Sequence, residues 1–323
     1  YKELNFDIYR DDIVFKDLGL AVVDEQHRFG VHQRMSLSSK GHGVDVLVMT
    51  ATPIPRTLTL TAYGDMDVSR MPDKPAGRKP IDTHTFSMDR YGEIAGNLKN
   101  VLAEGARVYW VCPLVKESEL IDLAAAEDRF KDLKKLYGDQ VGLVHGQMKA
   151  AEKDAVMAKF QAGEISVLVA TTVIEVGVNV PEATVMIIEH AERFGLSQLH
   201  QLRGRVGRGL DKSTCLLMYR GPLGETAKAR LKIMRDTQDG FVIAEEDLRL
   251  RGAGEVLGTR QSGLPAFRIA SLDAHANLLP TVHDDVKLML HHDPSLQSPR
   301  GQELRSLLYL FRRDQAIHYL KSG

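Results

Sequence analysis

A pair of adjacent carboxylates is the first part of the chain with residues suited to chemistry. Asp24 and Glu25 directly follow an apolar run at residues 18–23. Carboxylate oxygens are ligands that Mg²⁺ prefers, and a carboxylate beside the ion polarises an attacking water. The pair therefore suits hydrolysis of a phosphate chain. Alone, such a pair is more often a solvated strand end.

The run "QLHQLRGRVGRG" is the second such part. It presents Gln201, Arg205 and Arg208 with glycines between them, so that guanidinium groups can approach a phosphate chain closely. Arginine suits this task because its planar fork meets phosphate oxygens with two hydrogen bonds and keeps its charge. Arg203 and Lys212 lie in the same run, which predicts a local basic patch. The alternative is a solvated basic loop.

Two hydroxyls lie between these parts of the chain. A second apolar run, at residues 44–49, ends in Thr50 and Thr52, which flank a small residue. From a neighbouring strand end, both hydroxyls can hydrogen-bond the carboxylate site. The alternative is a turn that caps a helix beginning near Arg56.

The elements that must position these residues alternate along the chain. Short β-branched runs are interleaved with segments of helical periodicity at residues 91–105 and 150–164, which end near Gly105 and Gly163. This order predicts parallel sheets with crossover helices, an α/β fold. The predicted strands are 44–49, 108–111, 141–144, 167–169 and 185–188.

Two shifts in composition divide the chain. Residues 70–82 hold three prolines and several basic residues, which predicts a linker between two α/β units. From Glu225 onward helical patterns predominate. They predict a helical hairpin that turns at Asp239 and Gly240 and ends at Gly252, followed by a glycine-rich loop at residues 252–263.

Composition narrows the class of protein. The 323 residues are 43% hydrophobic and 26% charged, as in globular proteins of about two domains. No apolar run approaches the ~20 residues needed to cross a bilayer, and no signal peptide is recognisable, so we expect a cytoplasmic protein without a membrane partner. A net charge of −1 excludes a wholly basic nucleic-acid coat. Cys112 and Cys215 lie in apolar runs, which predicts buried thiols.

Taken in order, the motifs resemble those of the superfamily 2 helicases. Four runs together resemble the RecG family of bacterial branched-DNA translocases: "DEQHRFGVHQR", "TATPIPRTL", "ERFGLSQLHQLRGRVGRG" and "DGFVIAEEDLRLRGAGEVLGTRQSG". The resemblance implies the tail of a first RecA-like domain at 1–75, a RecA-like parallel-sheet motor domain at 76–224, and a translocation hairpin, loop and C-terminal helices at 225–323. It also implies ATP and Mg²⁺ as ligands, branched or duplex DNA as the partner, and a monomer associated with the bacterial nucleoid.

The resemblance assigns roles to residues of the first RecA-like domain. Asp24 would bind Mg²⁺ through water, and Glu25 would lie at the ion and activate the hydrolytic water. Four further residues would couple this site to the second motor domain or to DNA: Gln26, His27, Thr50 and Thr52.

Beyond the linker, the resemblance implies Arg205 and Arg208 as arginine fingers and Gln201 as a phosphate contact. Gly177 and Asn179 would line the nucleotide cleft. Many relatives carry aspartate at the position of Asn179. The asparagine keeps an acceptor oxygen but lacks the negative charge. Four residues of the hairpin and loop would transmit domain closure to duplex DNA: Arg249, Arg251, Arg260 and Gln261.

The chain lacks one motif that such motors need. No G-x-x-x-x-G-K-S/T phosphate loop occurs, and in the family this loop and a wedge domain lie upstream of residue 18. Residues 1–10 do not match the family, so we expect a truncated or spliced chain that does not hydrolyse ATP alone. The alternatives are the motor of a transcription-repair coupling factor and a short DNA-binding module that retains motor motifs as relics. Intact carboxylate and arginine motifs favour a working enzyme.

Overall fold

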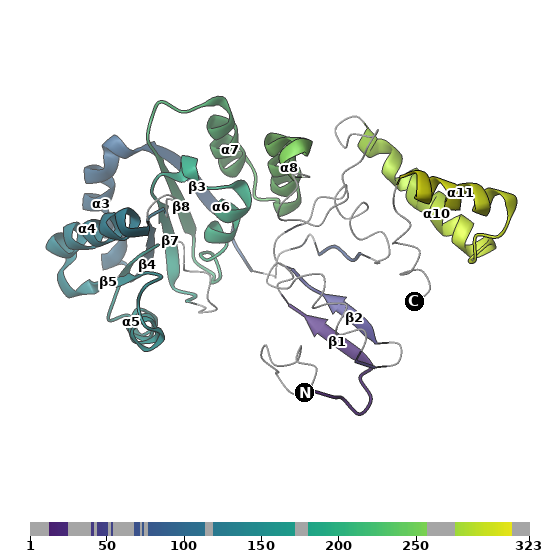
Figure 1. The fold of residues 1–323 in the computed structure, drawn as a ribbon. Coiled ribbons are helices and arrows are strands. Elements are labelled where there is room, and N and C mark those ends of the chain that lie inside the picture. Colours follow the sequence, from purple (N-terminus) through teal and green to yellow (C-terminus); the bar gives the residue numbers. More distant parts are fainter. Residues whose placement is uncertain are drawn as a thin grey trace. The chain divides into compact units, whose positions relative to one another are not determined.

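The computed structural model describes residues 13–24, 40–41, 44–50, 53, 68–71, 73, 77–113, 119–171, 180–256 and 275–311. The chain divides into two compact units, Tyr1–Pro53 and Ile54–Gly323. In the first unit, β1 (Leu20–Val23) and β2 (Asp45–Val48) pair in parallel (Figure 1). Ala21 and Val23 are buried against the valines of β2.

The second unit is built on a six-stranded sheet in which every described pairing is parallel. The strand order is β3-β8-β7-β4-β6-β5. The bounds are β3 (Ile81–Ser87), β4 (Arg107–Val111), β5 (Val141–Val144), β6 (Val167–Ala170), β7 (Ala183–Ile188) and β8 (Ser213–Tyr219).

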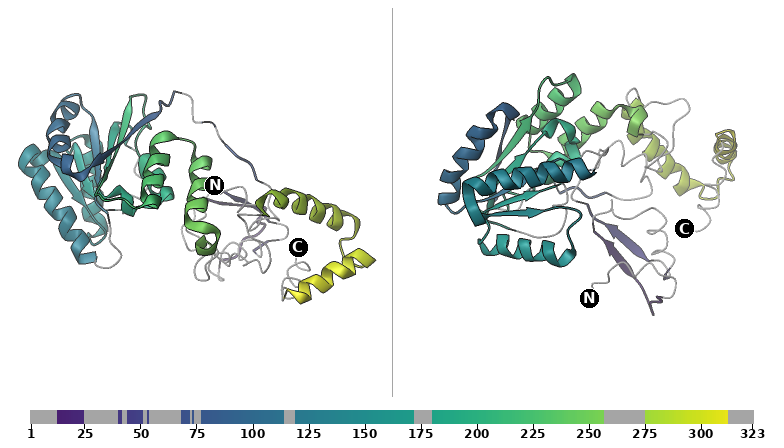
Figure 2. Two further views of the ribbon diagram at one scale, coloured as in Figure 1. Left: turned by 90° about the horizontal axis from the view of Figure 1, so that it is seen from above. Right: turned by 60° about the vertical axis from the view of Figure 1, so that its left-hand side comes forward.

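Helices cover both faces of this sheet (Figure 2). Phe160, Leu199 and Leu231 pack on one face, and Leu98 and Leu133 pack on the other. The helices are α3 (Tyr91–Ala103), α4 (Glu119–Tyr137), α5 (Ala150–Ala162), α6 (Leu196–Arg203), α7 (Glu225–Asp236), α8 (Gly240–Val256), α10 (Leu279–His292) and α11 (Pro299–Leu310). The short 3-10 helices are η3 (Met88–Arg90), η4 (Gly138–Gln140), η5 (Ala191–Arg193) and η6 (Ala276–Leu278).

The predicted α/β fold is confirmed, because strands covered on both faces are near-continuous apolar runs that the sequence reveals. The five predicted strands fall within one residue or two of β2, β4, β5, β6 and β7. Gly163 caps α5 in the left-handed region with φ of 83°, as predicted, and Gly105 has the same φ just beyond α3. Both cysteines are buried, and burial raises the pKa of the Cys215 thiol to about 12.

Other predictions are wrong in detail. The predicted linker at 70–82 extends too far, because Ile81 and Asp82 already belong to β3. The second hairpin helix does not end at Gly252: α8 continues through Gly252 and Gly254 to Val256, since each glycine costs a helix only about 1 kcal/mol. Residues 252–256 of the predicted loop are therefore helical, and residues 257–263 lie outside the described part. Within the described residues, no helix is both long and apolar enough to cross a membrane.

Candidate functional site

In the first unit, the predicted acidic site lies where two strands end. Because β1 and β2 are parallel, their last residues share one edge, where the Met49 N–H donates to the Val23 carbonyl at 2.8 Å. Asp24 follows Val23 and Thr50 follows Met49, so the chain brings this carboxylate and this hydroxyl to the same edge. Both groups offer oxygen ligands that suit a hydrated Mg²⁺ ion. The other residues predicted here, Glu25, Gln26, His27 and Thr52, lie outside the described part of the chain.

In the second unit, helix α6 leads into the predicted phosphate-binding arginines. Leu196, Leu199 and Leu202 are buried on one side of α6, while Gln201 is exposed. The helix begins at Gly195, whose N–H donates to the Gln198 side chain at 3.1 Å. Residues 204–212, which we call the arginine loop, connect α6 to β8 and contain Arg205 and Arg208.

Two glycines allow the arginine loop to lie directly against the amino-terminal edge of the sheet. Gly207 has a φ of 72°, and a Cβ there would lie 2.9 Å from the Ile81 side chain at the start of β3. A Cβ on Gly209 would lie 2.8 Å from the carbonyl oxygen of Pro181, which precedes β7. Larger residues are therefore excluded at both positions. The structure thus gives Gly207 and Gly209 a packing role, which the sequence did not indicate.

Positive charges gather around the arginine loop. Burial lowers the pKa of the Arg208 guanidinium, and the charges of Arg205 and Arg78 lower it further. Burial raises the pKa of Tyr109, and the positive charges of Arg205 and Arg208 act in the opposite direction. Arginine stays protonated throughout the physiological range, so these groups repel one another, and an anion between them relieves that repulsion. The arrangement suits a phosphate chain.

Arg203 is not part of the surface patch that the sequence predicted. Its residue is only 2% exposed, and burial lowers the pKa of its guanidinium. Nη1 donates to the carbonyls of Met234 at 2.7 Å and Thr237 at 2.9 Å. These carbonyls belong to the last turn of α7 and the residue after it. Arg203 therefore ties the end of α6 to the hairpin formed by α7 and α8.

Two further contacts tie the start of α6 to the same hairpin. The Arg230 guanidinium of α7 donates to the carbonyls of Phe194 at 2.6 Å and Glu192 at 3.2 Å, in the turn before α6. The Ser197 hydroxyl donates to Asp247 of α8 at 2.8 Å. Helix α6 is thus held by α7 and α8 at both ends. Sequence reasoning missed these residues, because their partners are carbonyls or lie far along the chain.

The remaining predicted residues are placed only in part. Arg249 is exposed on α8 and pairs with Glu246 at 2.6 Å, one turn away. That pair raises the pKa of the Arg249 guanidinium. Arg251 belongs to α8. Gly177, Asn179, Arg260 and Gln261 lie outside the described residues.

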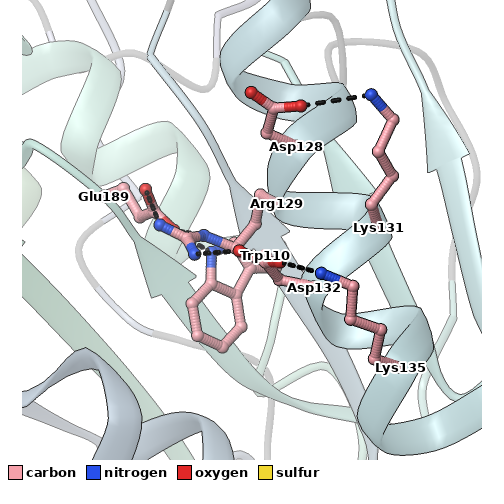
Figure 3. Close-up of polar contacts among 7 residues, drawn as sticks. All are labelled: Trp110, Asp128, Arg129, Lys131, Asp132, Lys135 and Glu189. Atoms are coloured by element: carbon pink, nitrogen blue, oxygen red, sulfur yellow. Dashed lines mark hydrogen bonds and ion pairs between the residues drawn. The ribbon is translucent and has the colours of Figure 1, made fainter.

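A buried polar cluster lies at the opposite, carboxyl edge of the sheet (Figure 3). Glu189 follows β7 and is only 5% exposed. It accepts a hydrogen bond from Trp110 Nε1 at 2.6 Å and forms an ion pair with Arg129 of α4. The Arg129 guanidinium also lies 3.7 Å from the centroid of the Tyr91 ring. A cavity of about 390 Å³ adjoins the cluster. The cluster fixes the turn that leads to α6. Sequence analysis missed it, although a single glutamate at the end of an apolar strand could have indicated it.

Comparison with known proteins identifies two regions of the chain. Residues 94–209, from α3 through most of the arginine loop, match the helicase conserved C-terminal domain. Residues 237–317, from the hairpin turn onward, match domain 3, C-terminal, of the ATP-dependent DNA helicase RecG.

Whole-protein relatives agree with these matches. The chain is 51% identical over 295 residues to the ATP-dependent DNA helicase RecG of Pasteurella multocida (strain Pm70), covering 90% of this chain and 43% of that protein. It is 52% identical over 281 residues to that of Escherichia coli (strain K12), covering 85% and 40%. A solved structure of RecG bound to a three-way DNA junction shares 45% identity and a TM-score of 0.64, over 83% of this chain and 34% of the other.

The matched chain spans less than half the length of these relatives. Its parallel six-stranded sheet with helices on both faces is the RecA-like fold of a helicase motor domain. Most of the arginine loop and all of α8 lie in the matched regions, whereas α7 lies between them. Over 85–90% of its length the chain is therefore similar to part of the ATP-dependent DNA helicases of the RecG family.

Proposed function

We propose that this chain supplies the second motor domain and the coupling hairpin of an ATP-dependent translocase that remodels branched DNA. Its tasks would be reversal of stalled forks and branch migration of Holliday junctions. Residues 1–75 are the tail of motor domain one, 76–224 are motor domain two, and 225–323 are the hairpin, loop and C-terminal helices. The ligands are ATP and Mg²⁺, and the protein acts as a monomer in the nucleoid-associated cytoplasm.

One observation carries the proposal: helix α6 is bonded to the hairpin at both ends. Arg230 and Ser197 hold its start, and Arg203 holds its end. The arginine loop follows α6 directly, so a displacement of the loop that moves α6 moves α7 and α8 as well. This is the connection that a motor needs between its phosphate contacts and its DNA contacts.

Within this proposal each group of residues has one task. Arg205 and Arg208 stabilise negative charge on the transferred phosphate, Gln201 contacts the phosphates, and Gly177 and Asn179 line the nucleotide cleft. Asp24 and Glu25 hold the hydrated Mg²⁺ and orient the attacking water. Gln26, His27, Thr50 and Thr52 couple this site to the second domain and to DNA. The DNA contacts come from the hairpin and its loop, through Arg249, Arg251, Arg260 and Gln261.

The match of residues 237–317 supports a RecG-type motor over the related motor of a transcription-repair coupling factor. The proposal is tested first on the chain itself. Because these residues contain no lysine-bearing phosphate loop, we expect no multiple-turnover ATP hydrolysis with three-way junction DNA. In the full-length enzyme, we expect DNA-stimulated hydrolysis and junction movement, and Glu25→Gln should abolish both. DNA-stimulated turnover by the chain alone, lost in Glu25→Gln, would contradict the expected inactivity.

A further inference from the structure

Gln238 joins the hairpin to the end of the linker. It lies in the turn between α7 and α8, and its carboxamide makes two hydrogen bonds with one residue of the edge strand β3. Gln238 Oε1 accepts from the Ile81 N–H at 3.2 Å, and Gln238 Nε2 donates to the Ile81 carbonyl at 3.2 Å. The side chain thus pairs with Ile81 as the backbone of a neighbouring strand would.

The residues around Ile81 connect this contact to the arginine loop. The Ile81 side chain lies against Gly207, where a Cβ would approach it to 2.9 Å. Thr237, which precedes Gln238, accepts a hydrogen bond from Arg203 at 2.9 Å. One turn of the hairpin therefore contacts both the start of β3 and the end of α6.

The linker contacts the hairpin at a second point as well. The Arg70 guanidinium lies 5.1 Å from the centroid of the Phe241 ring in the first turn of α8. Arg70 is the first residue of the segment predicted as the linker at 70–82, and Ile81 is its last residue but one and the first residue of β3. Both of its ends therefore lie on the hairpin.

We propose that Gln238 is a positioning residue that fastens the linker to the hairpin, so that the linker, the arginine loop and the hairpin move as one body. The inference rests on the proposed motor function and adds the linker to the coupled parts. The carboxamide supplies an acceptor for the Ile81 N–H and a donor to the Ile81 carbonyl, which also accepts from the Thr83 hydroxyl at 3.3 Å. Leucine offers neither, and an ionised glutamate accepts but cannot donate. Asparagine has both groups but is one methylene shorter.

The contact is tested by hydrogen exchange on the 323-residue chain, with peptides or resonances that cover Ile81. Loss of two neutral hydrogen bonds corresponds to a factor of roughly 5–30 in an equilibrium, so exchange at Ile81 should accelerate to that extent in Gln238→Leu. Gln238→Glu keeps an acceptor for the Ile81 N–H and loses only the donor to the carbonyl, so it should accelerate exchange less than Gln238→Leu, and amides of β4 should not change. The matched control is Gln140→Leu, an exposed glutamine in η4 on the far side of the sheet. Unchanged exchange at Ile81 in Gln238→Leu would overturn the inference.

The coupling role is tested in the full-length enzyme by measuring hydrolysis, branch-migration rate and melting temperature on the same preparations. We expect Gln238→Leu and Gln238→Glu to keep DNA-stimulated hydrolysis while branch migration slows roughly 5–30-fold. Gln238→Asn should recover part of the rate. A parallel fall of hydrolysis, migration and melting temperature would overturn the coupling role and leave Gln238 a structural residue. If the unaltered enzyme shows no DNA-stimulated hydrolysis, the motor function fails and the coupling role with it, while exchange at Ile81 still decides whether the contact exists.

Discussion

The Ser197 hydroxyl on α6 donates a 2.8 Å hydrogen bond to Oδ2 of Asp247 on α8, a residue that is only 7% exposed. A buried carboxylate must keep hydrogen-bond donors around it, because leaving a charge without them inside a protein is costly. The pair therefore holds the second hairpin helix at a defined place on the helix that leads to the arginine loop. It joins residues 50 positions apart in the chain.

Removing this hydroxyl should loosen α8 on α6. For Ser197→Ala, we expect the free energy of unfolding to fall by roughly 1.5–3 kcal/mol, the range for a hydrogen bond to a charged group. The single tryptophan, Trp110, is fully buried in the same unit and reports denaturant unfolding by fluorescence. Ser306→Ala is the matched control, since the exposed Ser306 hydroxyl donates to a neutral carbonyl within its own helix, α11. Equal effects of the two changes would contradict this account.

Arg203 tests how a buried positive charge contributes to stability. Its described hydrogen-bond partners are two backbone carbonyls, which carry no negative charge. Arg203→Ala should destabilise the chain strongly, since it removes two hydrogen bonds and leaves a cavity. Arg203→Met fills much of that space and removes the desolvation cost of the charge, so it should be milder. Denaturant unfolding of both variants separates the contributions. If Met is as damaging as Ala, the hydrogen bonds outweigh packing.

The finger role of Arg208 is tested by hydrolysis and DNA binding together. In the full-length enzyme, Arg208→Ala should reduce ATP hydrolysis by roughly 10³-fold or more, the range for known arginine fingers. DNA affinity at low salt should hardly change if the guanidinium faces nucleotide. The same pair of measurements on Arg205→Ala shows which arginine carries the larger share. A weaker DNA affinity with a flatter salt dependence and normal hydrolysis would instead place Arg208 on DNA phosphates.

The acid dependence of stability provides a third kind of test at Glu192. Burial alone would raise its pKa, but hydrogen bonds from His190 and from backbone N–H groups outweigh burial and lower it. A depressed pKa means that the carboxylate stabilises the fold above its unfolded pKa and that this contribution is lost as the pH falls through the folded value. Glu192→Gln should therefore lower stability at neutral pH and flatten its decline below about pH 4.

The matched control is Glu225→Gln, whose partner Lys228 is exposed on α7. That pair is solvated, so its removal should have little effect. Unfolding curves between neutral and acidic pH provide the measurement. An unchanged pH profile in Glu192→Gln would show that the turn before α6 gains nothing from this carboxylate.

The sequence predicted β4, β5, β6 and β7 of the six-stranded sheet but missed the edge strand β3 and the inner strand β8, for a physical reason. Strands such as β6 and β7 are covered on both faces and consist of apolar residues, which form a clear pattern. β3 is an edge strand in which residues 82–85 are all polar, and it directly follows the proline-rich linker. β8 likewise begins with Ser213 and Thr214, so an unbroken apolar run reveals a strand more readily than a run that includes polar residues.

The residues of the candidate site were also predicted only in part. Arg205 and Arg208 were predicted because their side-chain chemistry and glycine spacing are visible in the sequence. Arg203 was assigned to the same basic patch, yet it is buried among backbone carbonyls of α7. Nothing in the sequence distinguishes the three arginines, because carbonyl partners leave no trace in residue type. Only the tertiary contacts distinguish Arg203, which is structural, from Arg205 and Arg208 of the arginine loop.

The glycine-rich segment that the sequence predicts as a loop carries the last prediction, which separates force transmission from simple support. Helix α8 continues through Gly252 to Val256, so the hairpin extends further toward Arg260 and Gln261 than the glycines suggested. If this hairpin acts as a lever, Arg260→Ala or Gln261→Ala in the full-length enzyme should leave DNA-dependent hydrolysis largely intact while branch migration fails. If the hairpin only closes the base of motor domain two, both activities and the melting temperature should fall together. Arg300→Ala on α11 serves as a control for loss of a positive charge outside the hairpin. Measuring all three quantities on each variant decides between the two, because a lever transmits motion and a plug only stabilises.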